Sequence, residues 1–154
     1  SNQILSMKLR AGKDEFLEYK YILKDNDYLV DFDLKTQGLH NVLNTSKPLN
    51  LEFDLKTFRN EKSISYENRY TEIYFEHKEG KVDYAGLGQT EESDLEKATF
   101  VAFKQHFFST ILLTKTPFET AKVKSDNLVK DDKIDTTYTK QFKANIPLAF
   151  QMGN

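Results

Sequence analysis

The side chains that could carry out chemistry are few and widely spaced in this sequence. It contains no Cys and three His, namely His40, His77 and His106, none of which lies two or four residues from another. A zinc site is usually built from several His or Cys at short spacing, and a chain without Cys has no disulfides or thiolate nucleophiles. We therefore predict no metal site, and we interpret the imidazoles as surface or core-edge groups.

Two further motifs give weak chemical signals. Asp31 and Asp33 lie on one face of an alternating segment, but Lys35 continues that face and the neighbouring residues supply no third acid. A solvated strand face explains them better than a pair of acid–base catalysts. Gly86-Leu87-Gly88 lacks the third Gly and the following helix of a dinucleotide site, so we predict a turn or bulge there. The sequence thus predicts no catalytic residues and no bound cofactor.

Arginine is the one residue type that is used unevenly. The chain has 3 Arg and 19 Lys, and Arg59 and Arg69 both flank the polar segment 58–70. Because a guanidinium presents a planar fork of donors that Lys lacks, these two residues indicate specific hydrogen bonding. One interpretation is structural, with both side chains tying the segment to Glu61, Glu67 or Glu72. The other is recognition of a partner, for which the candidate binding residues are Arg59, Tyr66, Arg69 and Tyr70.

The composition favours a β domain that does not bind nucleic acid. The net charge of the 154 residues is −2, which gives little attraction for a phosphate backbone. No stretch approaches the roughly 20 apolar residues that are needed to cross a bilayer. Aromatic residues make up 13% of the chain, with 12 Phe and 8 Tyr, and these types suit a pleated, half-buried surface. We therefore expect one all-β domain.

Alternation of apolar and polar residues marks most of the expected strands. It is most regular from Leu49 to Lys56, and strand patterns also occupy 5–10, 17–23, 28–35, 71–77, 82–88, 118–124, 134–142 and 144–150. The most apolar segment, 98–114, predicts a strand buried on both faces and broken by a bulge, with Phe107 and Phe108 in the core. The polar segments 58–70 and 91–96 predict a structured loop and a solvated loop. Eight to ten short strands separated by turns are typical of an antiparallel sandwich.

Three segments together resemble the large periplasmic domain of the YidC family of bacterial membrane protein insertases, in the form found in Bacteroidetes. Residues 19–32 are similar to a strand, turn and strand of that family, and Arg59 with 66–70 is similar to its aromatic loop. Residues 101–110, VAFKQHFFST, are the most specific match, with Phe100 where the family usually has Trp.

This resemblance implies an antiparallel β-supersandwich of the galactose mutarotase type, in a truncated version. Residues 1–2 would then be an expression-tag scar, and 3–154 the larger, later part of the periplasmic domain. The implied function is non-catalytic: a domain of a membrane protein insertase and chaperone that offers a surface to Sec translocon components such as SecDF, or to nascent membrane proteins. It would lie at the periplasmic face of the bacterial inner membrane, anchored by other segments. The alternative is a carbohydrate-binding or aldose-epimerase-like domain.

Overall fold

The computed structural model describes residues 1–149, so the last residue of the expected strand 144–150 lies outside the described residues. The chain forms two compact units, Ser1–Lys47 and the part that starts at Pro48. All the strand pairs described in residues 1–149 are antiparallel, and the prediction of an antiparallel all-β fold is confirmed. The galactose mutarotase-like arrangement stays a prediction.

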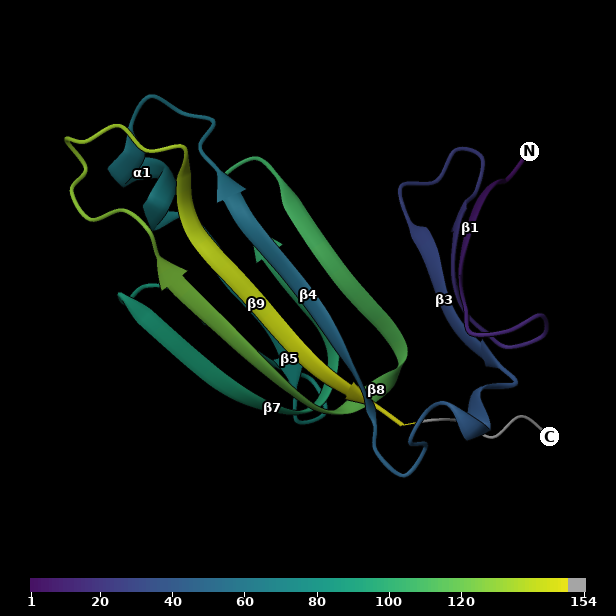
Figure 1. The fold of residues 1–154 in the computed structure, drawn as a ribbon. Helices are drawn as coiled ribbons and strands as arrows, with labels where there is room; N and C mark the ends of the chain where they lie inside the picture. Colours follow the sequence, from purple (N-terminus) through teal and green to yellow (C-terminus); the bar gives the residue numbers. More distant parts are fainter. Residues whose placement is uncertain (150–154) are drawn as a thin grey trace. The chain divides into compact units, whose positions relative to one another are not determined.

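The first unit is a three-stranded sheet in the order β1-β2-β3. Its strands are β1 (Gln3–Arg10), β2 (Phe16–Leu23) and β3 (Val30–Gln37), and the short helix η1 (Leu39–Asn41) follows them. Figure 1 shows these strands as the purple and blue part of the ribbon. The strand patterns over 17–23 and 28–35 correspond to β2 and β3, and residues 16–23 pair with 30–37 as a hairpin. The alternation of apolar and polar residues in β1 does not produce a buried face, since all residues of this strand are exposed.

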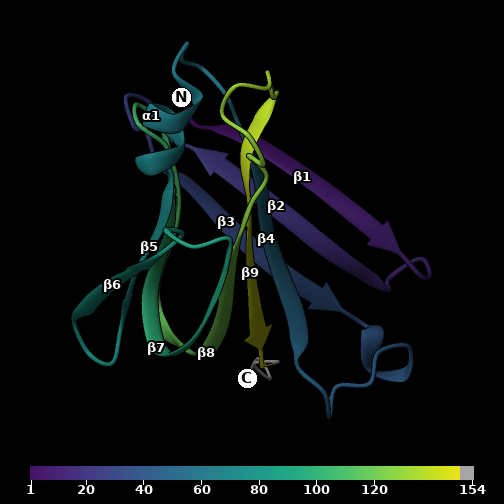
Figure 2. The ribbon, with the colours of Figure 1, turned by 90° about the vertical axis from the view of Figure 1, so that its left-hand side faces the viewer.

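The second unit is a six-stranded sheet in the order β4-β9-β8-β7-β5-β6. Its elements are β4 (Leu49–Phe58), α1 (Ile64–Arg69), β5 (Glu72–His77), β6 (Lys81–Ala85), β7 (Thr90–Lys104), β8 (Ser109–Asn127) and β9 (Tyr138–Leu148). Figures 1 and 2 both show α1 at the end of this sheet where β4 ends and β9 begins. In β4 the alternation predicts burial correctly, because Leu51, Phe53 and Leu55 are part-buried and the polar residues between them are exposed.

Aromatic rings fill the centre of the second unit. Phe103 on β7 and Phe142 on β9 are completely buried, and their ring centroids are 5.4 Å apart. Phe53 on β4 stacks on Phe103 at 4.5 Å. Because the three rings come from three strands, their contact fixes which face of each strand is turned to the core.

The prediction of one buried strand over 98–114 is wrong. The structure divides this segment between β7 and β8, and Gln105 N donates to Phe108 O at 2.7 Å across the turn that joins them. Phe107 and Phe108 lie in this turn and are 72% and 61% exposed, so the prediction that they belong to the core is also wrong. Hydrophobicity misled the prediction because this turn lacks Gly, Pro and Asn, the residues that usually mark one.

The two polar segments also differ from their predictions. Residues 91–96 belong to β7 and not to a loop. Their acidic side chains are balanced across the ladder: Lys122 Nζ of β8 lies 3.6 Å from a carboxylate oxygen of Glu92 and 3.9 Å from one of Asp94. Segment 58–70, predicted as a loop, contains the helix α1. Six residues are too few to show a helical period in the sequence.

Candidate functional site

Helix α1 is held in place by its own polar side chains. Ser63 precedes the helix, and its Oγ accepts a hydrogen bond from Tyr66 N at 3.3 Å, which satisfies one free amide of the first turn. The carboxylate of Glu67 is buried and accepts from Asn60 N at 2.9 and 3.0 Å and from Glu61 N at 3.1 Å. One buried acid therefore fastens the preceding loop to the helix.

An exposed aromatic cluster forms where α1 meets the β7–β8 turn, and it consists of Tyr66, Tyr70, His106 and Phe107. Tyr66 and Tyr70 are four residues apart, so they lie on one side of the helix, with ring centroids 4.9 Å apart. The His106 ring lies 5.2 Å from each Tyr ring and 4.2 Å from Phe107. All but His106 are exposed, so the cluster presents ring faces and edges to solvent.

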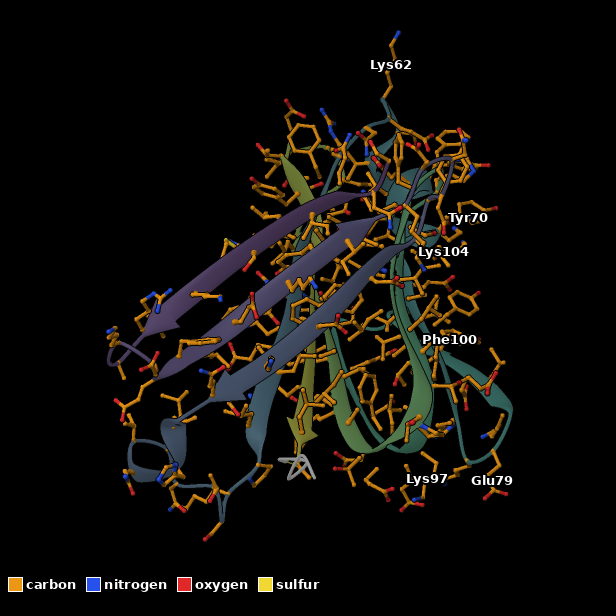
Figure 3. All side chains as sticks on the ribbon, turned by 90° about the vertical axis from the view of Figure 1, so that its right-hand side faces the viewer. Lys62, Tyr70, Glu79, Lys97, Phe100 and Lys104 are labelled. Atoms are coloured by element: carbon orange, nitrogen blue, oxygen red, sulfur yellow. The ribbon has the colours of Figure 1, made fainter. Side chains whose placement is uncertain are left out.

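The polar groups around this cluster restrain it. His106 Nδ1 lies 2.5 Å from Glu61 Oε1, in a part-buried pair. Tyr70 beside Tyr66 raises the pKa of the Tyr66 hydroxyl above its usual value, so Tyr66 stays a neutral hydrogen-bond donor at physiological pH. Figure 3 shows Lys62, Tyr70 and Lys104 toward one end of the second unit, and Lys97 and Glu79 toward its other end.

Three of the four predicted partner-binding residues lie on α1 or at its end, namely Tyr66, Arg69 and Tyr70. Tyr66 and Tyr70 are in direct contact. Arg59 Nη2 instead pairs with Asp135 Oδ1 at 2.6 Å, and its partner is none of the three glutamates that the structural interpretation named. Arg69 lies on α1 and lines a neighbouring hollow.

That hollow has a volume of about 580 Å³ and is bounded by α1, by the bend between β6 and β7, and by the loop after β8. Lys140 of β9 lines it and is only 3% exposed. Its Nζ donates to the backbone oxygens of Thr71 and Gly86. Burial lowers the pKa of Lys140 to about 8, against a smaller opposing effect of Glu72 and Glu91.

Glu91 also binds the backbone of the bend between β6 and β7. Its carboxylate accepts from Gly86 N at 2.5 Å and Gly88 N at 2.6 Å, and the hydrogen bond from Gly86 is the main reason why the pKa of Glu91 lies below its usual value. Gly86 adopts a φ of +125°, which favours glycine. The prediction of a turn at 86–88 is therefore confirmed.

The sequence interpretation named Glu67 only as a possible partner of the arginines, and it missed Lys140, Glu91 and the role of His106. For Lys140 a signal existed, because residues 138, 140 and 142 share one face of an alternating strand, and Phe142 points to the core. Glu67 and Glu91 gave none, since acids in polar segments are normally solvated. Among residues 1–149, no three His, Asp or Glu side chains gather as metal ligands.

These features define an all-β protein with an exposed aromatic cluster at one end of its larger sheet. The family described as the YidC periplasmic domain matches residues 1–151, and the chain belongs to that family. The family description assigns the domain to the periplasm, as predicted. None of the helices in residues 1–149 is long and apolar enough to span a membrane.

Several curated relatives are named membrane protein insertase YidC. The chain is 27% identical to the protein of Bacteroides fragilis and 26% to that of Parabacteroides distasonis, over 95% of this chain and 23% of each relative. It is 28% identical to the protein of Porphyromonas gingivalis over 76% of this chain and 19% of that relative. The relatives are named as insertases and not as enzymes, which agrees with the prediction of a non-enzymatic domain. The chain spans about a quarter of their length, and no solved structure matches it significantly.

Proposed function

We propose that this chain is a non-catalytic interaction domain of a membrane protein insertase and chaperone, which assists the insertion and folding of inner-membrane proteins. The family match and the names of the relatives support this proposal. The domain would stand at the periplasmic face of the inner membrane, anchored by other parts of a longer protein. Its partners would be Sec translocon components such as SecDF, or nascent membrane proteins.

The observation that carries the proposed contact is the aromatic cluster. Tyr and Phe side chains are large and rigid, and Tyr is among the residue types that dominate binding energy at protein interfaces. Phe107 is 72% exposed, and Tyr66 and Tyr70 are 42% and 37% exposed. Glu61 contacts His106 of the cluster, and the buried Glu67 accepts a hydrogen bond from the backbone of Glu61. These contacts restrain the cluster, so little conformational entropy is lost on binding.

Site-specific photocrosslinking tests the contact in the full-length protein in its native cells. A photoreactive phenylalanine at position 107 should give a discrete adduct with a Sec component or a nascent membrane protein. The matched control is the same probe at Val82, which is 55% exposed on β6 and outside the cluster. The proposed contact would be wrong if positions 107 and 66 gave no adduct, or if position 82 gave the same one.

Carbohydrate binding is the second candidate, because exposed aromatic rings can also stack on sugars. Titration of the chain with hexoses, followed by NMR, separates the two candidates. The interaction proposal expects unmoved signals at Tyr70 and Phe107 at millimolar sugar. Saturable shifts confined to the cluster would favour the carbohydrate-binding domain instead.

A further inference from the structure

The hollow beside α1 is lined by charges of both signs. Arg69, Lys130 and Lys140 contribute three cations, and Asp131 and Asp132 contribute two carboxylates. This hollow is distinct from the aromatic cluster, because none of the four cluster residues lines it.

These five charges do not neutralise one another. Within residues 1–149 no ion pair of 4 Å or less joins any two of them, and the Arg69 side chain has no hydrogen bond. Asp131 Oδ1 accepts only the backbone N–H of Lys133, at 2.9 Å. Lys140 is the buried member, and two carbonyl oxygens satisfy two of its three N–H donors. The third N–H has no partner among the described residues.

We propose that the hollow binds a small zwitterion that carries a phosphate monoester and an ammonium group, as in O-phosphoethanolamine. Arg69 offers a fork that matches two phosphate oxygens, and the free N–H of Lys140 can donate to a third. The ammonium group would pair with Asp131 and Asp132. A simple anion would meet these two carboxylates, and a simple cation would meet the three positive groups.

Net charge distinguishes this ligand from other zwitterions. The residues that line the hollow carry one more cation than anions, and Glu72 and Glu91 act on Lys140 from outside the lining. A phosphate monoester carries nearly two negative charges at neutral pH. With one ammonium group the ligand is left close to one negative charge, which complements the lining. An amino acid or a phosphodiester headgroup would be neutral overall.

Calorimetric titration of the chain with O-phosphoethanolamine at low ionic strength tests the proposal. We expect saturable binding that Arg69→Gln weakens at least tenfold, because the fork is lost. Arg69 is exposed, and its side chain makes no hydrogen bond within residues 1–149, so the variant should fold, which far-UV circular dichroism verifies. The matched control is Arg10→Gln on β1, outside the hollow, which should leave the affinity unchanged.

The double variant Asp131→Asn/Asp132→Asn tests the zwitterion specifically. It should weaken binding of O-phosphoethanolamine and strengthen binding of inorganic phosphate, because repulsion of the anion disappears. The proposal is overturned if the wild-type chain does not bind O-phosphoethanolamine, if Arg10→Gln and Arg69→Gln behave alike, or if the double variant changes neither affinity.

Vesicles distinguish a free compound from a lipid headgroup. The phosphatidylethanolamine headgroup is a phosphodiester and is neutral overall, so we expect the chain to bind the soluble compound and not to bind phosphatidylethanolamine vesicles. Binding of the soluble compound alone identifies a free metabolite. Binding to phosphatidylethanolamine vesicles would contradict the proposal, because the hollow would then accept a phosphodiester without the second negative charge.

Discussion

A buried lysine and a part-buried glutamate hold the backbone of a single glycine. Glu91 accepts from Gly86 N, and Lys140 donates to Gly86 O, so the opposite charges act on the bend through its backbone and not through a direct ion pair. Burying a charge costs free energy unless hydrogen bonds and opposite charges compensate. For Lys140 the compensation is incomplete, because its pKa remains below that of a solvated lysine.

This pKa shift predicts how stability depends on pH. The pKa of Lys140 is about 8 in the folded chain, against 10.5 for a free lysine. Between these values the unfolded chain binds more protons than the folded chain, so this residue makes the free energy of unfolding rise with pH. From pH 7.5 to pH 10 the rise should be about 2 kcal/mol.

Urea unfolding of the wild type and of Lys140→Met at the two pH values measures the effect. Other titrating groups affect both proteins alike, so the difference between them isolates Lys140. The free energy of unfolding of the wild type, relative to that of Lys140→Met, should be about 2 kcal/mol higher at pH 10 than at pH 7.5. The control Lys143→Met, on the same strand, should show no such movement. A constant difference for Lys140→Met would show that the ammonium is well solvated.

At the scale of the element, segment 58–70 shows why a short helix needs stabilising tertiary contacts. Isolated helices this short do not form in water, and α1 has six residues. The Ser63 cap and the two backbone amides held by Glu67, those of Asn60 and Glu61, supply the missing stability. The sequence shows the cap as a Ser, but it cannot show that the Glu67 carboxylate turns inward.

The stability losses of the variants Glu67→Gln and Arg59→Ala test which of the two residues stabilises segment 58–70. Glu67→Gln replaces one acceptor oxygen by an NH₂ group that faces a backbone amide, and we expect a loss of about 2 kcal/mol. Arg59→Ala removes an ion pair whose Asp135 side chain is 84% exposed, and the loss should stay below about 1 kcal/mol. Urea unfolding measures both values. The reverse order would make Arg59 the main structural tie.

The strands could be predicted where one face is exposed to solvent and the other is at least partly buried. In β4 the partly buried Phe53 lies between exposed polar neighbours, so period-two alternation locates the strand. It failed for the β7–β8 hairpin, where Phe103 is buried and Phe107 lies in an exposed turn. Of the candidate site, the sequence pointed to Tyr66 and Tyr70, but not to the partners that come from the distant turn. Contacts over such sequence separations follow from the order of strands in the sheet, which local patterns do not encode.

At the scale of the whole molecule, the two units differ in how much apolar surface they bury. In residues 1–47, all of which are described, the buried hydrophobic residues are Phe16 and Leu39. The second unit contains a continuous core that includes Ile73, Phe103 and Phe142, each completely buried. Burial of apolar side chains is the dominant favourable term in folding, so the two sheets should differ in stability.

Amide hydrogen exchange of the chain tests this difference. Local opening is easiest where few buried apolar contacts resist it, so amides bonded within β2 should exchange at least tenfold faster than those in β8 and β9. Both comparisons use amides in the interior of a sheet, because β2 lies between β1 and β3, and β8 and β9 have neighbours on both sides. Equal protection in both sheets would show that they unfold as one cooperative unit. Faster exchange in β2 would show that the first sheet opens without the second.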